Sequence, residues 1–362
     1  MPPADRQDFE PWLRLTLIPG LGNAALRKLL REFGSPERVL AARRAELQRL
    51  VAADIAAQIT AGGNAGGTQQ ALEWLADSAN AIVTLGEADY PQLLLQTADP
   101  PPLLYVKGRR ELLNRPALAI VGSRNATARG LADAEDFARA LSDAGMTIVS
   151  GLALGIDAAA HRGGLAGTAS SLAVVGTGLD VVYPARNRAL AHQLASGGAL
   201  VSEFALGTPA LGANFPRRNR VISGLSRGCL VVEAALQSGS LITARLANEQ
   251  GREVFALPGS IHSPLAKGCH ALIKQGAKLV ESAADILEEL QLAATPSAVL
   301  SAAELDPGMT RLLAELGFEP TDLDTLCERC GMGADAVSAL LLKLELQGLI
   351  ANLPGGQYQR VR

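Results

Sequence analysis

The chain has 362 residues, of which 48% are hydrophobic and 19% are charged, and its formal net charge is −3. This composition excludes a disordered chain and predicts two or three packed domains. No apolar run reaches the roughly 18 residues of a membrane span, the first residues do not form a signal peptide, and four cysteines do not suit a secreted disulfide framework. We therefore expect a cytoplasmic protein that does not associate with membranes.

Residues 1–95 carry apolar residues at the three- and four-residue spacing of amphipathic helices, as at Trp12, Leu13 and Leu17. This pattern predicts a helical domain. The domain resembles SAM or helix-hairpin-helix domains. Its segment from Ile18 to Leu30 looks like a helix-hairpin-helix element, whose glycine turn can hold a DNA phosphate. An ordinary connection between two helices explains the same residues equally well.

Residues 96–292 alternate short apolar runs with helical stretches, a pattern that predicts βαβ units and a Rossmann-like, mostly parallel sheet in an α/β fold. Such sheets bind ligands at the carboxyl ends of their strands. A short strand is also expected at Leu103–Gly108, after a proline-rich connection. The strands expected in the βαβ units are Leu118–Val121, Thr147–Val149, Ser171–Val175, Leu200–Ser202, Cys229–Val232 and Glu253–Ala256. The helices expected there are Arg129–Ala144, Ile156–Gly163, Arg188–Ala195, Leu241–Glu249 and His270–Gln275.

Residues 293–305 have the composition of a linker, and residues 306–362 predict a small winged-helix domain with three helices and a hairpin. The domain is acidic around Asp322 and Asp324, so we expect it to contact proteins rather than duplex DNA. Cys327 and Cys330 have metal-ligand spacing but no second pair of ligands, so no metal is expected.

Positive charge is concentrated in one part of this acidic chain. Between Pro184 and Gly228 there are six arginines and one acid, Glu203. Such a run favours an anionic ligand because local charge, not net charge, sets the local potential. A solvated surface explains it about as well.

Glycine-rich turns follow several of the expected strands. In the first, Gly122 lets the backbone approach a ligand, Ser123 offers a hydroxyl and Arg124 suits bidentate binding of phosphate. The amides that open the following helix would then face an anion. Taken alone, a glycine after a parallel strand is more often a requirement of the turn.

A second turn, from Gly151 to Gly155, provides another set of free amides in this interpretation. It is followed by Asp157 and His161, which lie one helical turn apart. They could form an acid–base pair, but a role in local hydrogen bonding is the better interpretation. Neither this turn nor Gly176-Thr-Gly178 has the G-x-G-x-x-G spacing of dinucleotide-binding sites.

The segment from Asn214 to Arg220 combines an aromatic residue, three arginines and two amides in seven positions. Phe215 could stack on a base while the arginines meet phosphates, which is how many proteins bind single-stranded nucleic acid. A buried phenylalanine beside solvated arginines is the alternative. A further Gly/Ser turn at Ser238–Ser240 precedes another expected helix.

Taken in order, these motifs resemble the DNA-processing protein A (DprA, or Smf) family. They are Val-Gly-Ser-Arg, Ser-Gly-x-Ala-x-Gly-Ile-Asp-x-x-Ala-His, Gly-Thr-Gly-Leu-Asp-x-x-Tyr-Pro-x-x-Asn, Asn-Phe-Pro-x-Arg-Asn-Arg and Ser-Gly-Ser-Leu-Ile-Thr-Ala. The resemblance extends from about Tyr90 to Leu287. The resemblance implies a Rossmann-like domain that binds single-stranded DNA, protects it and loads the RecA recombinase onto it during natural transformation. It also implies a homodimer through this domain, with no catalytic activity and no cofactor. One departure is Cys269-His270, where many relatives carry Thr or Ser followed by Asn.

By motif position, the resemblance implies a set of DNA-binding residues on the rim formed by these turns. The set comprises Gly122, Ser123, Arg124, Gly151, Gly155, Arg186, Asn214, Phe215, Arg217, Arg218, Asn219, Arg220, Ser238, Gly239 and Ser240.

An enzyme is the competing hypothesis, because phosphoribohydrolases that act on nucleotides also present glycine turns to phosphate. Those enzymes require a Pro-Gly-Gly-x-Gly-Thr-x-x-Glu turn. The corresponding segment here, from Glu233 to Leu241, lacks that arrangement.

Overall fold

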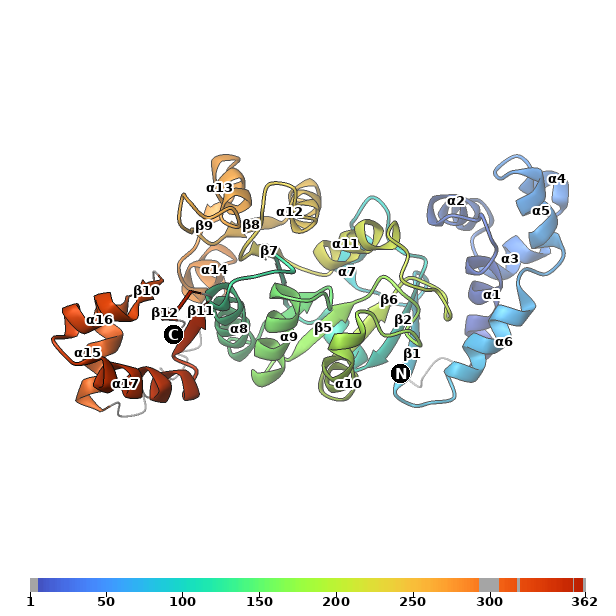
Figure 1. Ribbon diagram of the computed structural model, residues 1–362. Helices are drawn as coiled ribbons and strands as arrows, with labels where there is room; N and C mark the ends of the chain where they lie inside the picture. The colour runs from blue at the N-terminus through green and yellow to red at the C-terminus, as the bar shows by residue number, and fades with distance from the viewer. Residues whose placement is uncertain (1–5, 293–305, 318–319, 354, 361–362) are drawn as a thin grey trace.

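A sheet of nine strands forms the centre of the computed structural model, which describes residues 6–292, 306–317, 320–353 and 355–360 (Figure 1). The strand order is β1-β2-β6-β5-β4-β3-β7-β8-β9, and the seven strands from β6 to β9 are parallel. The predicted α/β class with a mostly parallel sheet is therefore confirmed. The strands are β1 Asn80–Thr84, β2 Leu103–Gly108, β3 Ala117–Val121, β4 Thr147–Ser150, β5 Ser171–Val174, β6 Ala199–Ser202, β7 Gly228–Val231, β8 Glu253–Ala256 and β9 Lys278–Leu279.

Strand β1 lies in a stretch that the sequence predicted to be helical, and that prediction is wrong. It pairs antiparallel with β2, which in turn pairs antiparallel with β6, so β1 forms one edge of the sheet. Its side chains Ile82 and Val83 are fully buried on opposite faces. Burial on both faces gives a continuous apolar run, which cannot be distinguished from a buried helix by periodicity.

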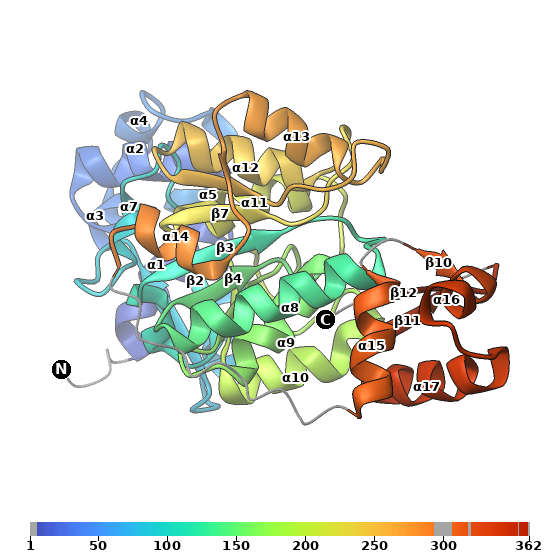
Figure 2. The ribbon, with the colours of Figure 1, turned by 90° about the vertical axis from the view of Figure 1, so that its left-hand side faces the viewer.

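Helices cover both faces of the sheet because its strands are apolar at consecutive positions. In β3, Ala119 and Val121 face one core, while Leu118 and Ile120 face the other. Figure 2 shows the two helical layers edge-on. One layer contains α8 Ala128–Asp143, α9 Ile156–Ala166, α10 Arg188–Gly197 and α14 Ala283–Glu289, and the other contains α7 Gln92–Leu95, α11 Asn214–Gly224, α12 Ser240–Glu249 and α13 Lys267–Lys274.

Helix α11 was not predicted from the sequence, because the segment was interpreted only as a cluster of ligand-binding side chains. Its polar first turn has no helical pattern of apolar residues and contains Pro216. Proline is tolerated in the first turn of a helix, where its missing N–H has no intrahelical partner. The buried residues Val221 and Ile222 lie one turn further on and pack against the sheet.

The N-terminal unit is helical from Arg6 to Trp74. Its helices enclose a core of their own around Leu26, Leu29 and Ile59, while Phe9 and Leu13 pack with the sheet core. The helices are α1 Arg6–Thr16, α2 Asn23–Phe33, α3 Pro36–Ala41, α4 Arg44–Leu47, α5 Ala53–Thr60 and α6 Ala65–Trp74.

The C-terminal unit is the predicted winged helix, with three helices around a core that includes Leu312 and Leu341 and a hairpin that closes it. The predicted linker lies outside the described residues. The elements are α15 Pro307–Leu316, β10 Thr321–Asp322, α16 Leu323–Cys330, α17 Ala334–Leu346, β11 Ile350–Leu353 and β12 Gln357–Arg360. In the part of the chain that the structure describes, no helix is long and apolar enough to cross a membrane.

Two adjacent glycines in α9 allow this helix to pack closely between α8 and the sheet. A Cβ atom on Gly163 would lie 2.1 Å from the carbonyl oxygen of Glu135, and one on Gly164 would lie 2.9 Å from Ile148 Cβ. We therefore predict that Gly163→Ala lowers the free energy of unfolding by about 1–3 kcal/mol, measured by chemical denaturation.

The matched control is Gly66→Ala, because Gly66 is also helical and has open space around its Cβ position. This change should raise stability by about 0.5–1 kcal/mol, since alanine is the better helix former. Equal effects at the two positions would contradict the packing argument.

Candidate nucleic-acid interface

The first glycine turn lies where the sheet changes its winding direction, between β3 and β7. Ser123 donates its backbone N–H to the carbonyl of Glu233 (2.7 Å), and the Glu233 carboxylate accepts bonds from Thr127 N (2.9 Å) and Oγ1 (2.6 Å). The predicted anion position at the start of α8 is thus filled by a side chain of the protein itself. The Ser123 hydroxyl, also predicted to contact DNA, is buried and accepts from Asn125 N.

Backbone N–H groups of the second turn likewise donate to side chains of the protein itself. Gly151 N and Ala153 N donate to the Asp157 carboxylate at 3.1 and 3.3 Å, so these two amides, which the sequence predicted to be free, are engaged. His161 Nε2 accepts from Leu152 N, and its Nδ1 lies 2.7 Å from Ser171 Oγ. Burial lowers the pKa of His161 to about 3 and raises that of Asp157. Both side chains therefore hold the turn, as the hydrogen-bonding interpretation predicted.

Gly155 is needed in this turn because two loops meet there. Its φ is +79°, and a Cβ atom would lie 2.2 Å from the carbonyl oxygen of Ser123. Gly151 similarly makes room for the Arg218 guanidinium, which would lie 2.5 Å from a Cβ atom. The glycines that suggested phosphate contacts instead bring protein segments close together.

Arg218 is a structural residue, which corrects its predicted role as a DNA contact. It is 5% exposed and donates to the carbonyls of Gly151 (2.7 Å) and Val174 and to Asn219 Oδ1 (3.1 Å). These bonds join α11 to the ends of β4 and β5. Burial lowers the pKa of Arg218 to about 10, partly offset by the charge of Asp157, so it stays protonated at neutral pH.

Arg220 is also committed to internal partners, since it pairs with Glu203 and Asp99 and its side chain is 13% exposed. Arg217 bonds Glu203 at 3.1 Å but leaves 47% of its side chain exposed. Asn214 Nδ2 donates to the carbonyl of Gly176 (3.1 Å) and so anchors the start of α11. Of the five polar side chains predicted in this segment, Arg217 alone is exposed.

Phe215 forms a cluster with two side chains from other loops. Its ring centroid lies 5.5 Å from that of Tyr183, and the Arg124 guanidinium lies 5.9 Å from it. Tyr183 is 46% exposed, and Phe215 is partly exposed over the Gly176 turn. We call Arg124, Tyr183 and Phe215 the Phe215 cluster. Tyr183 was not predicted as a DNA contact. Its position three residues before Arg186 places an aromatic side chain near a cation, a pattern that could have indicated this role.

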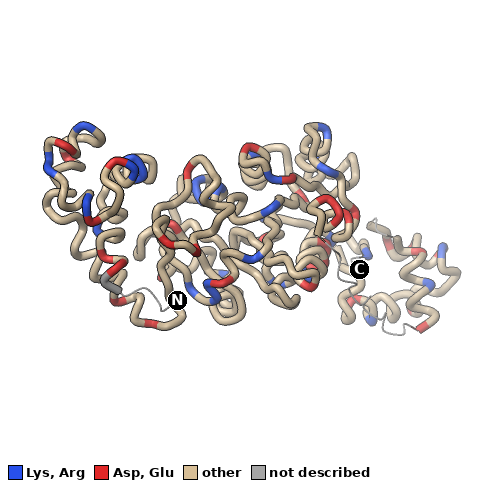
Figure 3. The backbone as a smooth tube through the Cα atoms, turned by 180° about the vertical axis from the view of Figure 1, so that it is seen from behind, with Lys and Arg blue, Asp and Glu red and all other residues tan. Residues whose placement is uncertain are grey.

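Two exposed arginines are available to a ligand: Arg124 of this cluster, and Arg186, which follows Tyr183 by three residues. Arg124 and Arg186 are exposed, and no hydrogen bond or ion pair engages either guanidinium within the described residues. Figure 3 shows that basic and acidic positions are interspersed elsewhere along the chain. The Phe215 cluster thus combines one exposed and one partly exposed aromatic ring with unneutralised charge at the carboxyl edge of the sheet.

The Ser238–Ser240 turn lies at the same edge, after β7. Ser238 Oγ and Ser240 Oγ lie 2.7 Å apart and Ser240 N donates to Ser238 Oγ, so these hydroxyls partly satisfy one another. Gly239 is exposed, with open space at its Cβ position. Among the described residues, no group of three or more His, Cys, Asp or Glu side chains could hold a metal ion.

The sequence from β1 to α14 matches the family model for DNA recombination-mediator protein A over residues 81–291. The chain belongs to this family. Residues 295–356 match a second model, the DprA winged helix domain.

Members of the family from several bacteria are similar over most of their length. The chain is 47% identical to protein Smf of Escherichia coli over 303 residues, which is 81% of each protein. It is 46% identical to DNA processing protein DprA of Streptococcus pneumoniae over 202 residues, covering 56% of this chain and 71% of that protein.

Two solved structures are also similar. The X-ray structure of the Streptococcus pneumoniae DprA has a TM-score of 0.68 and 34% identity, covering 80% of this chain and 99% of that chain. A structure that describes a unique single-stranded DNA binding mode of DNA processing protein A from Helicobacter pylori has a TM-score of 0.53 and 30% identity. It covers 58% of this chain and 95% of that chain.

Because Arg218 is buried and donates to internal carbonyl groups, its replacement should lower the stability of the fold. We predict that Arg218→Met lowers the free energy of unfolding by about 3–5 kcal/mol, because two carbonyls lose a donor and the buried Asp157 loses its compensating charge. Chemical denaturation at neutral pH measures this loss.

Arg124→Met is the matched control, and it should stay within about 0.5 kcal/mol of the parent because Arg124 is exposed. If Arg218→Met unfolds like the parent but fails to bind DNA, Arg218 is a direct contact and this assignment is wrong.

Proposed function

We propose that this family member binds single-stranded DNA along the carboxyl edge of its sheet, through the Phe215 cluster. The observation that supports this most strongly is the contact between exposed Tyr183 and partly exposed Phe215, beside the Arg124 guanidinium, which has no hydrogen bond or ion pair within the described residues. Stacking on an aromatic side chain stabilises each base by about 1–3 kcal/mol, and arginines supply the phosphate contacts. The single-stranded DNA binding described for the Helicobacter pylori relative agrees with this role.

In this proposal the protein is a mediator that protects single-stranded DNA and loads the RecA recombinase onto it during natural transformation, in the cytoplasm. The family model, named for mediation of recombination, supports the mediator role. We further propose a homodimer through the sheet domain. A groove of about 680 Å³ between α12 and α13, next to the exposed Leu236, offers a surface for such contact.

We propose binding without catalysis. The one acid–base pair in the turns, Asp157 and His161, is buried and engaged with the backbone. Glu233 begins the segment that corresponds to the phosphoribohydrolase turn, and its carboxylate accepts hydrogen bonds from Thr127 at the start of α8. Incubation of the pure protein with AMP should release no free base, and release would revive the enzyme hypothesis.

Two variants should separate stacking from charge. Arg124→Ala should weaken oligonucleotide binding and make the slope of log affinity against log salt shallower by about 0.7, because one phosphate contact is lost. Phe215→Ala should weaken binding by about 1–3 kcal/mol and leave the salt slope unchanged. Fluorescence anisotropy with a labelled thymidine oligomer at two or more salt concentrations measures both quantities.

The control is Arg139→Ala, because Arg139 is an exposed arginine near the C-terminal end of α8, at the opposite edge of the sheet. It should bind like the parent. If Arg124→Ala and Phe215→Ala also bind like the parent, the proposed site is wrong.

A further inference from the structure

The N-terminal helical unit contacts the sheet domain through polar residues of α2. Asn23 and Arg27 lie one helical turn apart on this helix. Asn23 Nδ2 donates to Glu203 Oε2 (3.1 Å), while Arg27 pairs with Asp99 (2.5 Å) and donates to the carbonyl of Pro100 (2.9 Å). Hydrogen bonds and an ion pair therefore hold α2 against the segments that precede β2 and follow β6.

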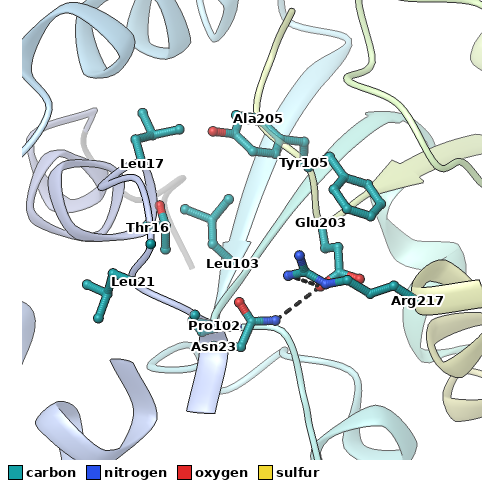
Figure 4. A pocket seen from close by; sticks show the side chains of 13 residues that line it. Thr16, Leu17, Leu21, Asn23, Pro102, Leu103, Tyr105, Glu203, Ala205 and Arg217 are labelled. Atoms are coloured by element: carbon teal, nitrogen blue, oxygen red, sulfur yellow. Dashed lines mark hydrogen bonds and ion pairs between the residues drawn. The ribbon is translucent and has the colours of Figure 1, made fainter. Parts of the chain in front are cut away.

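The same two acids also bind arginines of α11. Glu203 Oε2 accepts from Arg217 Nη2 (3.1 Å) and from Arg220 Nη2, and Asp99 pairs with Arg220 (3.3 Å). Figure 4 shows the side chains of Asn23 and Arg217 meeting at the Glu203 carboxylate. One buried carboxylate thus connects the N-terminal helical unit to the first turn of α11.

Arg217 carries the unbalanced charge of this network. Three arginines share two acids, Glu203 and Asp99, which leaves one positive charge in excess. The side chains of Arg27 and Arg220 are 19% and 13% exposed, whereas that of Arg217 is 47% exposed. Within the described residues, no second hydrogen bond or ion pair engages the Arg217 guanidinium. Its other N–H groups are therefore available to an anion from solvent.

Two contacts, rather than close packing, fix the Arg217 side chain. It lines a cavity of about 320 Å³ between the N-terminal helical unit and the sheet domain, so it has open space beside it. Its guanidinium lies 5.2 Å from the centroid of the Phe204 ring and bonds the Glu203 carboxylate. An arginine that is already ordered in this way loses less entropy when it binds a phosphate.

Arg217 is within reach of a strand bound at the Phe215 cluster. Phe215 and Arg217 both belong to the first turn of α11 and are two residues apart. Their Cα atoms are therefore about 5 Å apart, and their side chains leave the helix on opposite flanks. A strand that stacks on Phe215 and passes the start of the helix can place a neighbouring phosphate at Arg217.

We propose that Asn23 positions Arg217 for a phosphate of the bound strand, acting through Glu203 and without touching the DNA. With Asn23 in place, donors from both units hold the carboxylate. Without Asn23, the two arginines alone hold it, so it can shift toward Arg220 and Arg217 loses its fixed orientation. The N-terminal helical unit thus raises DNA affinity from outside the interface. The inference rests on the proposed function, because the phosphate belongs to the bound single strand.

The test is a double-mutant cycle on the full-length protein, with binding of a labelled thymidine oligomer measured by fluorescence anisotropy. Arg217→Met should weaken binding about tenfold, the size of one hydrogen bond to a charged group, and make the salt slope shallower by about 0.7. Asn23→Ala should weaken binding about threefold in the parent, a typical coupling within one hydrogen-bond network, and should have no effect in the Arg217→Met protein.

Gln69→Ala is the matched control, because Gln69 is another amide on a helix of the N-terminal unit and its side chain bonds Glu73 of the same helix. It should bind like the parent. An Asn23→Ala effect of equal size in both backgrounds, or no effect in the parent, overturns the inference. So does an Arg217→Met protein that binds like the parent. The proposed function survives these results if binding still requires Phe215, and it fails with the inference if it does not.

If Asn23→Ala does not fold, hydrogen–deuterium exchange of the parent and Arg217→Met proteins replaces it. Coupling between two sites is reciprocal, so DNA that binds Arg217 should also tighten the contact between Glu203 and α2. The oligomer should therefore slow amide exchange in α2 of the parent and leave it unchanged in Arg217→Met, at concentrations that saturate both proteins. An equal effect of DNA on α2 in the two proteins contradicts the inference.

Discussion

The carboxyl edge of the sheet depends on one buried cation. The Arg218 guanidinium joins the first turns of α11 to carbonyls at the ends of β4 and β5, and its Nε donates to Asn219 Oδ1. This arrangement fixes the start of the helix, and with it the positions of Phe215 on one flank and Arg217 on the other. A buried charge is tolerated only when it is fully hydrogen-bonded and balanced, and Asp157 provides the balance.

Carboxylate side chains of the protein accept hydrogen bonds from backbone N–H groups of the turns at this edge. We therefore expect exposed side chains to bind the DNA. Glu233 occupies the start of α8, and Asp157 takes the amides of the second turn. A sheet with this topology usually offers such amides to phosphate at the point where its winding reverses. Here the same positions rigidify the loops that carry Arg124 and Tyr183. A preformed aromatic surface costs little entropy when a flexible strand binds to it.

Much of the fold was predictable because buried parallel strands and amphipathic helices have strong periodic patterns. The core strands from β3 to β8 and the winged helix follow those patterns closely. The site was harder, since an arginine in sequence does not reveal its burial. The sequence predicts both Arg218 and Arg124 as phosphate ligands. Only the tertiary structure shows that Arg218 is buried and Arg124 is exposed. Strand β1 and helix α11 were missed for the related reason that long-range packing decides their conformation.

The central claim is that DNA lies on the Phe215 cluster rather than over the arginines of α11 as a group. Photo-cross-linking measures this directly, with a thymidine oligomer that carries 5-iodouracil, followed by mass spectrometry of the adducts. The account predicts adducts on Phe215 and Tyr183. Adducts confined to the winged helix, or to the N-terminal helical unit, would contradict it.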